Sequence, residues 1–287
     1  MNDQANRLRA LARSQTPEPT LFSSRVMAIA SGKGGVGKTN VVAGLAMSLA
    51  QQGQRVVVLD ADFGLANLDI LLGLTPEFTL EHVLRGENLM EEILLDGPFG
   101  IRIIPASSGV QELTRLDASA ELRLIQGLQR ISAESDWLLI DTAAGIHDSV
   151  IKLLMAAQEV LLVTTPEPTA LVDAYAMVKV VHLRDPHKPL WLLINNSQSQ
   201  EEAEETIEQL QAATHRFLDR ELHVLGMLPA DPFILQSVRQ QRGVVDLFPH
   251  APSSLAFRAA AQQLREKIPL QKDGFAAFWK GLTVEEL

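Results

Sequence analysis

The chain has 287 residues, of which 46% are hydrophobic, and this composition supports a packed core in one large α/β domain or two small ones. It contains no cysteine, which excludes functions that depend on a disulfide, a catalytic thiol or a cysteine-held iron–sulfur cluster. Its formal net charge of −10 argues against broad electrostatic binding to nucleic acid, because such binding needs an extended basic surface.

The sequence shows no sign of a membrane-spanning or exported protein. No run of eighteen or more uninterrupted apolar residues occurs in it. The first residues, MNDQANRLRALARSQ, lack the apolar core of a secretory signal peptide. We therefore expect a cytoplasmic protein, a location that also fits the absence of cysteine.

Two segments are expected to lie outside the main domain. Residues 1–24 combine a short helical pattern with the polar, proline-bearing stretch SQTPEPT, which is typical of a linker. Residues 269–287 begin with Pro269, which ends the last expected core helix. The central domain is therefore expected to span residues 25–268.

Within the central domain, short β-branched runs alternate with longer helical patterns, which indicates β-α-β units around a mostly parallel sheet. The expected strands are 26–30, 55–59, 101–104, 137–140, 160–164, 190–194 and 223–228. The expected helices are 40–51, 118–132, 149–157, 170–182, 201–217, 233–241 and 253–268. Several strands are apolar at nearly every position, which predicts a single doubly wound α/β domain with helices on both faces of its sheet.

A glycine-rich loop, SGKGGVGKT at residues 31–39, follows the first expected strand. Gly32, Gly37, Lys38 and Thr39 match the Walker A spacing G-x-x-x-x-G-K-[ST], and a helix follows directly. In such a loop the backbone N–H groups wrap the phosphates, the lysine reaches the β/γ oxygens and the hydroxyl ligates Mg²⁺. An ordinary glycine-rich turn with an incidental lysine is the weaker alternative. The expected nucleotide-binding residues of this segment are Gly32, Gly34, Gly35, Val36, Gly37, Lys38, Thr39 and Asn40.

Acidic residues follow two further strands. Asp60 and Asp62 stand in LDADFG, and Asp141 stands in WLLIDTAAG, which is the Walker B arrangement. Because ligands of open α/β sheets bind at the carboxyl ends of the strands, these carboxylates are expected to face the glycine-rich loop. A carboxylate there either holds Mg²⁺ or its water shell, or orients the attacking water, although acidic residues also simply start loops. The expected metal-binding residues are Thr39, Asp60 and Asp141.

Two other residues at strand ends are candidates. Asn195 ends the strand LWLLIN, and its amide has both a donor and an acceptor for the edge of a purine base. Asparagine is also an ordinary strand-ending residue, so both interpretations stay open. Gly145 follows Asp141 and is expected to let its segment move when the γ-phosphate is present or lost.

The motifs SGKGGVGKT, DADFGLANLD and DTAAG together resemble those of the deviant Walker A ATPases of the MinD/ParA type, over about residues 25–268. The resemblance implies ATP as the nucleotide and a homodimer formed with ATP. It also implies that Lys38 acts on the nucleotide of its own subunit and that Lys33 reaches across the dimer to the nucleotide of the partner. Asp62 then positions the water, Asp141 lies near the metal and Asn195 lies at the adenine. Asn40 stands where MinD-type loops often have a second hydroxyl residue.

The C-terminal segment DGFAAFWKGLTVEEL has the pattern of an amphipathic helix. Phe275, Phe278, Trp279 and Leu282 fall on one helical face, and Phe and Trp are the anchors expected at a bilayer interface. The alternative is that this face packs on the protein itself or on a neighbour. Membrane-cycling members of the family end in such a helix, so we expect reversible binding to the anionic inner face of the cell membrane.

The N-terminal segment carries a shorter motif. In NDQANRLRAL, the residues Asp3, Gln4, Ala5, Leu8 and Arg9 resemble the DQAxxLR activator motif of the flagellar members of this family. In those members the partner is FlhF, a signal-recognition-particle-type GTPase, and the glutamine enters its catalytic centre. A glutamine orients the attacking water in Ras-like GTPases, so Gln4 has a chemically sensible role. A generic frayed amphipathic helix is the alternative.

These observations predict an ATPase that acts as a dimerising switch and regulates flagellar number and placement. The resemblance further implies contacts with a flagellar transcription regulator and with components of the flagellar C-ring. No direct binding to nucleic acid is expected. Two alternatives remain: a partition ATPase of the ParA type whose ATP dimer coats DNA, and a regulatory binding module with negligible turnover.

Overall fold

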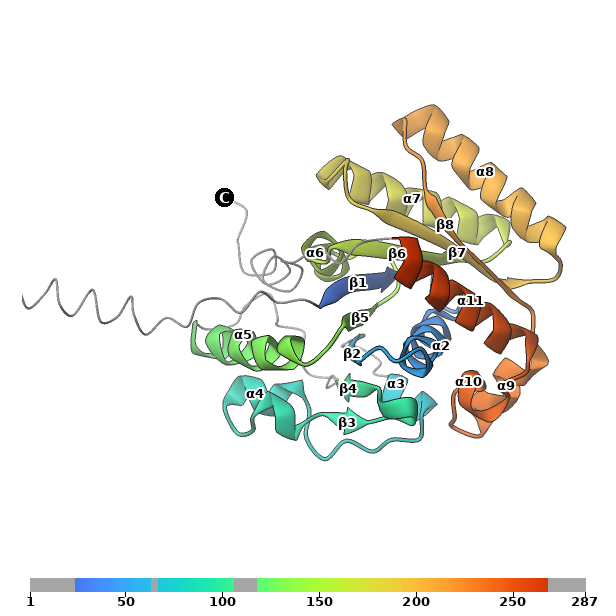
Figure 1. Ribbon diagram of the computed structural model, residues 1–287. Helices are drawn as coiled ribbons and strands as arrows, with labels where there is room; N and C mark the ends of the chain where they lie inside the picture. Colours follow the sequence, from blue (N-terminus) through green and yellow to red (C-terminus); the bar gives the residue numbers. More distant parts are fainter. Residues whose placement is uncertain (1–23, 63–66, 106–117, 268–287) are drawn as a thin grey trace, which may run out of the picture.

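The computed structural model describes residues 24–62, 67–105 and 118–267. It contains an eight-stranded sheet in the order β3-β4-β2-β5-β1-β6-β7-β8 (Figure 1). Every neighbouring pair is parallel except β3 and β4, which are antiparallel. This topology confirms the predicted doubly wound, mostly parallel α/β fold. The strands are β1 (Arg25–Ala30), β2 (Val56–Ala61), β3 (Leu95–Asp96), β4 (Arg102–Ile104), β5 (Trp137–Thr142), β6 (Glu159–Thr164), β7 (Leu190–Ser197) and β8 (His223–Pro229).

All seven predicted helices are present, with ends within two residues of the prediction. The helices are α2 (Lys38–Gln51), α3 (Leu68–Leu71), α4 (Leu80–Arg85), α5 (Ala118–Ala133), α6 (Asp148–Ala156), α7 (Pro168–Arg184), α8 (Gln200–Leu218), α9 (Pro232–Arg239), α10 (Val244–Leu247) and α11 (Pro252–Lys267), with 3₁₀ turns η1 (Met90–Glu92) and η2 (Pro98–Gly100). The prediction missed β3, α3, α4, α10 and both 3₁₀ turns. These elements span only two to six residues, which is too short for a hydrophobic period to stand out.

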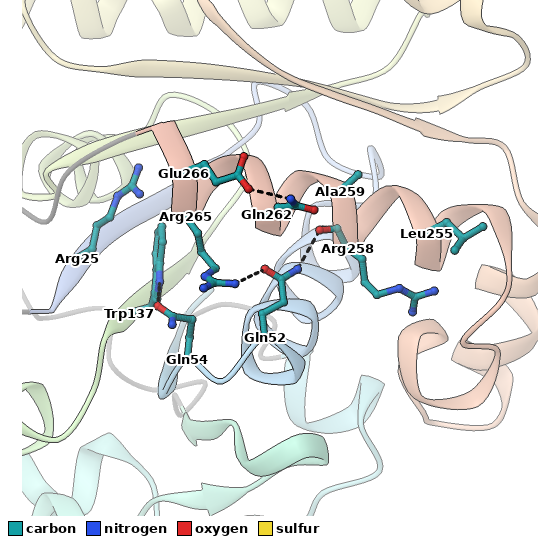
Figure 2. Close-up of a pocket in the computed structure, with 10 residues that line it drawn as sticks. All are labelled: Arg25, Gln52, Gln54, Trp137, Leu255, Arg258, Ala259, Gln262, Arg265 and Glu266. Carbon is teal, nitrogen blue, oxygen red and sulfur yellow. Dashed lines mark hydrogen bonds between the residues drawn. The ribbon is translucent and has the colours of Figure 1, made fainter.

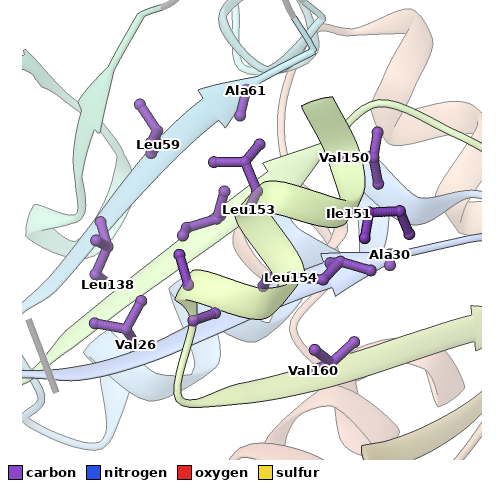
Figure 3. Close-up of a cluster of buried hydrophobic side chains, with 14 of the residues drawn as sticks. Val26, Ala30, Leu59, Ala61, Leu138, Val150, Ile151, Leu153, Leu154 and Val160 are labelled. Carbon is purple, nitrogen blue, oxygen red and sulfur yellow. The ribbon is translucent and has the colours of Figure 1, made fainter. Parts of the chain in front are cut away.

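Two apolar layers cover the sheet. On one face the core includes residues of α4, α5, α6, α7 and α8, and on the other face it includes residues of α2, α3, α10 and α11. Val26, Ala28 and Ala30 of β1 face the first layer, while Met27 and Ile29 face the second, so this strand is apolar on both sides. Figure 3 shows side chains of α6 packed over the strands in the first layer. The central strands β1, β2, β5 and β6 are buried throughout, with a helix layer on both sides, as their continuous apolar patterns predicted.

The last helix, α11, is held against α2 by a close contact. A Cβ atom at Gly44 of α2 would lie 2.5 Å from the ring of Phe257, which is fully buried. Only glycine leaves room for the ring at this point, so the two helices approach closely. This contact connects α11 to the helix that begins at Lys38.

A buried ion pair joins the start of β1 to the start of β6. Arg25 Nε lies 2.5 Å from Glu159 Oε1, and Arg25 Nη2 lies 2.7 Å from Oε2. Arg25 Nη1 also donates to the Leu264 carbonyl at 2.6 Å, and its guanidinium lies over the Trp137 ring at 4.4 Å from the centroid. Trp191 Nε1 donates to Glu159 Oε2 at 2.7 Å. Both tryptophans are buried in the core.

No helix among the described residues is long and apolar enough to cross a membrane. The N-terminal motif and the predicted C-terminal amphipathic helix both lie outside the described residues. The predicted boundaries of the three segments therefore remain predictions, with α11 ending at Lys267.

Candidate nucleotide-binding site

The glycine-rich loop connects β1 to α2 at the carboxyl edge of the sheet. Gly35 and Gly37 both have φ of +83°, a left-handed conformation that favours glycine. A Cβ atom at Gly37 would also lie 2.5 Å from Asn195 Nδ2, and one at Gly32 would lie 2.4 Å from the Asp173 carbonyl oxygen. The loop is therefore shaped by its glycines and supported by β7 and α7.

Lys38 and two aspartates form a buried charged cluster under this loop. Lys38 Nζ donates to Asp141 Oδ1 in an ion pair whose side chains are both buried. Asp60 and Asp141 are register partners on the neighbouring strands β2 and β5. Burial and the charge of Asp141 raise the pKa of Asp60 to about 6, although three backbone N–H donors oppose this rise. The two carboxylates are thus neighbours, and the Lys38 ammonium pairs with one of them, Asp141.

The surroundings of Asp141 shift its pKa in both directions. Burial raises the pKa of Asp141, while the Lys38 charge and the Thr39 hydroxyl lower it and the Asp62 charge raises it again. The Asp62 backbone N–H donates to Asp60 Oδ1 at 3.1 Å. The structure therefore brings together Thr39, Asp60, Asp62 and Asp141 with Lys38, all of which the sequence singled out.

The second lysine of the loop has a different environment. Lys33 Nζ contacts Glu167 Oε2 at 2.9 Å and Thr169 Oγ1 at 3.1 Å, at the beginning of α7. The Lys33 side chain is 40% exposed and that of Glu167 is 64% exposed, whereas Lys38 is only 7% exposed. One lysine of this loop is therefore buried among carboxylates, and the other lies at the surface.

A pocket of about 430 Å³ opens beside the loop. Its floor comprises residues 33–37 and Asn40, and Asn195 and Asn196 of β7 line one side. Asn195 Nδ2 donates to the Val36 carbonyl at 2.7 Å, so this side chain braces the loop as well as lining the pocket. Helix α9 forms another wall, with Asp231, Ile234, Leu235 and Val238.

Sequence reasoning missed the wall from α9 and the contact of Lys33 with Glu167. The stretch PADPF was an available signal for α9, because Asp231 followed by Pro232 is a strong helix start at the end of the last strand. No local sequence pattern predicts the contact between Lys33 and Glu167, because the two residues are 134 positions apart.

The residues of this pocket, together with the charged cluster under the glycine-rich loop, fit a magnesium-bound nucleotide. The hydroxyls of Ser31 and Thr165 are buried and have no hydrogen-bond partner, and Thr165 lines the pocket. A Cβ atom at Gly34 or Gly35 would meet only open space, so the loop has room for a ligand. Within the described ranges, no group of three or more His, Cys, Asp or Glu side chains has a metal-holding arrangement. Mg²⁺ commonly takes one or two carboxylates together with substrate phosphates and water, and Asp60, Asp141 and Thr39 offer such oxygens.

The start of α9 depends on a charged cap. Asp231 accepts hydrogen bonds from Phe233 N at 2.9 Å, Ser253 N at 3.0 Å and Ser253 Oγ at 2.6 Å. Burial by itself would raise the pKa of Asp231, but these hydrogen bonds hold it below its ordinary value of 3.8. The ionised carboxylate therefore fixes α9 against α11 and holds the pocket wall in place.

Asp231→Asn is expected to lower the free energy of unfolding by about 1–2 kcal/mol at pH 7, because a charged cap is replaced by a neutral one. A lowered folded-state pKa means that this stabilisation is complete above pH 3.8 and is lost as the pH falls through the folded value. Urea unfolding at pH 7 and at pH 3 measures the difference, with the exposed Asp219→Asn as the control. A deficit of equal size at both pH values would contradict the role of the charge.

Comparison with known proteins identifies the family of the chain. A family model described as an AAA domain matches residues 24–188. The chain is 46% identical to the Antiactivator FleN of Pseudomonas aeruginosa, over 84% of the chain and 86% of FleN. It is 32% identical to the Flagellum site-determining protein YlxH of Helicobacter pylori, over 98% of both chains.

A solved structure gives the same result for the fold. The septum site-determining protein MinD of Pyrococcus horikoshii, complexed with Mg-ADP, superposes with a TM-score of 0.70. The two proteins are 25% identical, and the match covers 85% of this chain and 96% of that one. The chain therefore belongs to the MinD/ParA-type P-loop ATPases, in the family of flagellar regulators that includes FleN and YlxH.

Proposed function

We propose that this ATPase is a switch in which ATP joins two copies of the chain and hydrolysis separates them. The observation that carries the proposal is the contrast between the two lysines of one loop. Lys38 is buried with Asp141 and belongs to its own site, while Lys33 lines the pocket with a side chain that is 40% exposed. An exposed lysine at this position is suited to reach the nucleotide of a facing subunit, in the manner of an arginine finger.

Nucleotide binding would redistribute the contacts of Lys38. The ammonium that pairs with Asp141 in this structure would turn to the β/γ-phosphates, and the carboxylates of Asp60 and Asp141, with the Thr39 hydroxyl, would then hold the metal. Magnesium supplies charge neutralisation for the in-line transfer of the phosphoryl group. Asp62, at the edge of the same cluster, would orient the attacking water, and Asn195 would lie toward the adenine.

The surface around Lys33 supports a dimer. Ile146 and Val172 are apolar side chains that are 49% and 68% exposed. Ile146 follows Gly145, whose N–H donates to the Ser31 carbonyl at 2.9 Å, and Val172 lies just beyond the Thr169 contact on α7. Exposed apolar side chains beside a binding pocket are typical of a surface that a partner covers. In the dimer, Lys33 would leave Glu167 and these side chains would be buried.

The appended segments would connect this switch to its partners. We propose that Gln4, within the motif of Asp3, Ala5, Leu8 and Arg9, activates an FlhF-type GTPase. The segment with Phe275, Phe278, Trp279 and Leu282 would hold the ATP dimer at the inner face of the cell membrane, because two weak anchors on one particle bind more tightly than one. The similarity to an antiactivator and to a site-determining protein supports control of flagellar number and placement, through a flagellar transcription regulator and the C-ring.

Light scattering on the full chain tests the switch. Asp62→Ala is expected to double its mass with Mg-ATP but not with Mg-ADP, because the ATP state persists when the water is not oriented. Adding Lys33→Ala should return the protein to the monomer with either nucleotide. Lys179→Ala, on the exposed side of α7, serves as the control and should leave the dimer intact. A mass that is the same with both nucleotides would contradict the dimer switch.

A further inference from the structure

A second and larger cavity, of about 740 Å³, lies at the opposite end of the sheet from the nucleotide pocket. Arg25 and Trp137, the first residues of β1 and β5, line one side of it. Gln52, just beyond the end of α2, also lines the cavity and forms hydrogen bonds with Arg258 and Arg265 of α11 (Figure 2). The cavity therefore opens beside the last turns of α11, where the described part of the chain ends at Lys267.

Two arginines in the walls of this cavity have no carboxylate partner within the described part of the chain. Arg265 Nη1 donates to Gln52 Oε1 at 3.2 Å, and Arg258 Nη2 donates to the Pro249 carbonyl, so both guanidinium groups contact neutral oxygens. Among the residues that the structure describes, no carboxylate oxygen lies within 4.0 Å of either group. Arg25 is different, because Glu159 already balances its charge.

The one acidic residue that lines the cavity does not neutralise these arginines. Glu266 Oε1 accepts a hydrogen bond from Gln262 at 2.8 Å, and Figure 2 shows it on the side of α11 away from Arg265. Arg258 and Arg265 are seven residues apart on one helix, so they lie on the same face at about 10 Å along the axis. Arg265 lies beside the Gln52 amide, whereas Figure 2 shows the Arg258 side chain extending in the other direction along α11. A guanidinium group without a carboxylate partner attracts anions, and phosphate matches its geometry best.

The sequence beyond α11 explains why such a site would be needed. Residues 269–287 contain two lysines and three carboxylate side chains, which gives this segment a net charge of −1. Its aromatic face can enter a bilayer, but attraction to an anionic membrane needs basic residues close to the surface. The described basic residues that come shortly before this segment are Lys267, Arg265 and Arg258. The two arginines line the cavity, as does exposed Leu255.

We propose that the cavity bounded by Arg258, Arg265 and Gln52 binds the phosphate headgroup of an anionic phospholipid. This inference rests on the membrane binding proposed above for the C-terminal segment and adds a second, electrostatic contact to it. The apolar face of the segment supplies insertion, and the two arginines supply selectivity for anionic lipid. The nucleotide pocket and the lipid site then occupy opposite ends of α2, which begins at Lys38 and is followed by Gln52.

Vesicle sedimentation of the full chain with Mg-ATP tests this proposal. Arg258→Gln combined with Arg265→Gln is expected to weaken binding to phosphatidylglycerol-containing vesicles by roughly thirtyfold, because each basic residue near an anionic surface contributes about fivefold. Binding to pure phosphatidylcholine vesicles should not change. Lys179→Gln combined with Arg239→Gln removes the same charge from exposed positions elsewhere and should bind like the parent. Arg258→Lys with Arg265→Lys should restore most of the binding.

The outcomes separate this inference from the proposed function. Trp279→Ala is expected to abolish binding to both kinds of vesicle, and its failure to do so would overturn the membrane anchor itself. If Trp279→Ala loses binding while the variant with Arg258→Gln and Arg265→Gln binds anionic vesicles like the parent, only the proposed lipid site is overturned. Displacement by inorganic phosphate at constant ionic strength would identify a free-phosphate site instead of a lipid site. If the variant with Arg258→Gln and Arg265→Gln had a different solution mass from the parent with Mg-ATP, the arginines would belong to a protein interface. That result would also overturn the proposal.

Discussion

Replacing Lys38 with alanine is expected to lower ATP turnover by at least about a hundredfold, because the site loses the buried cation that pairs with Asp141. A single donor at a transition state of this kind commonly contributes a factor of about 10²–10³. Lys38 is the described ammonium that contacts Asp141, and its side chain is only 7% exposed. Without Lys38, the phosphates of ATP would face the negative charges of Asp60 and Asp141 with no ammonium group from this position to offset them.

Phosphate release and ATP binding by the Lys38→Ala variant measure this effect. Lys38→Arg should not restore activity, because the larger planar guanidinium does not fit the buried space of an ammonium. Lys152→Ala, at an exposed position on α6, is the matched control and should keep the turnover of the parent. Near-normal turnover in Lys38→Ala would show that the Lys38–Asp141 pair has no part in catalysis.

Replacing Arg25 with methionine is expected to lower the free energy of unfolding by about 3–5 kcal/mol, the largest stability effect that we expect in this chain. Glu159 would remain buried with Trp191 as its remaining hydrogen-bond donor among the contacts described. The α11 carbonyl of Leu264 would also lose its donor. The free energy of unfolding therefore falls because the buried Glu159 carboxylate is left without its cation, and not only because one contact is lost.

A double-mutant cycle separates these causes. Glu159→Met alone should also destabilise the protein, because it leaves the guanidinium unpaired. Arg25→Met combined with Glu159→Met should be much closer to the parent, since no buried charge is left without a partner. Urea unfolding of the nucleotide-free protein gives all four free energies. Strictly additive losses would show that the two side chains do not act as a pair.

The sequence by itself determined the seven longer helices, every strand except β3, and the identity of the phosphate loop. These depend on short-range patterns: apolar periodicity for the helices and strands, and fixed spacing for Gly37, Lys38 and Thr39. The carboxylates could be assigned to the same site because parallel strands present their carboxyl ends at one edge. The N-terminal motif and the aromatic C-terminal face also come from the sequence alone, and they remain predictions.

The tertiary structure decided how distant residues are paired. β1 lies between β5 and β6, and no local sequence pattern predicts this strand order. As a consequence, the glycine-rich loop lies beside the start of α7. Lys33 contacts Glu167 there, although the two residues are 134 positions apart in the sequence. The α9 wall of the nucleotide pocket and the cavity beneath Arg265 depend on the same long-range packing. The physical reason is that a chain segment sets its own conformation through neighbouring residues, whereas the contents of a pocket depend on which segments the sheet brings side by side.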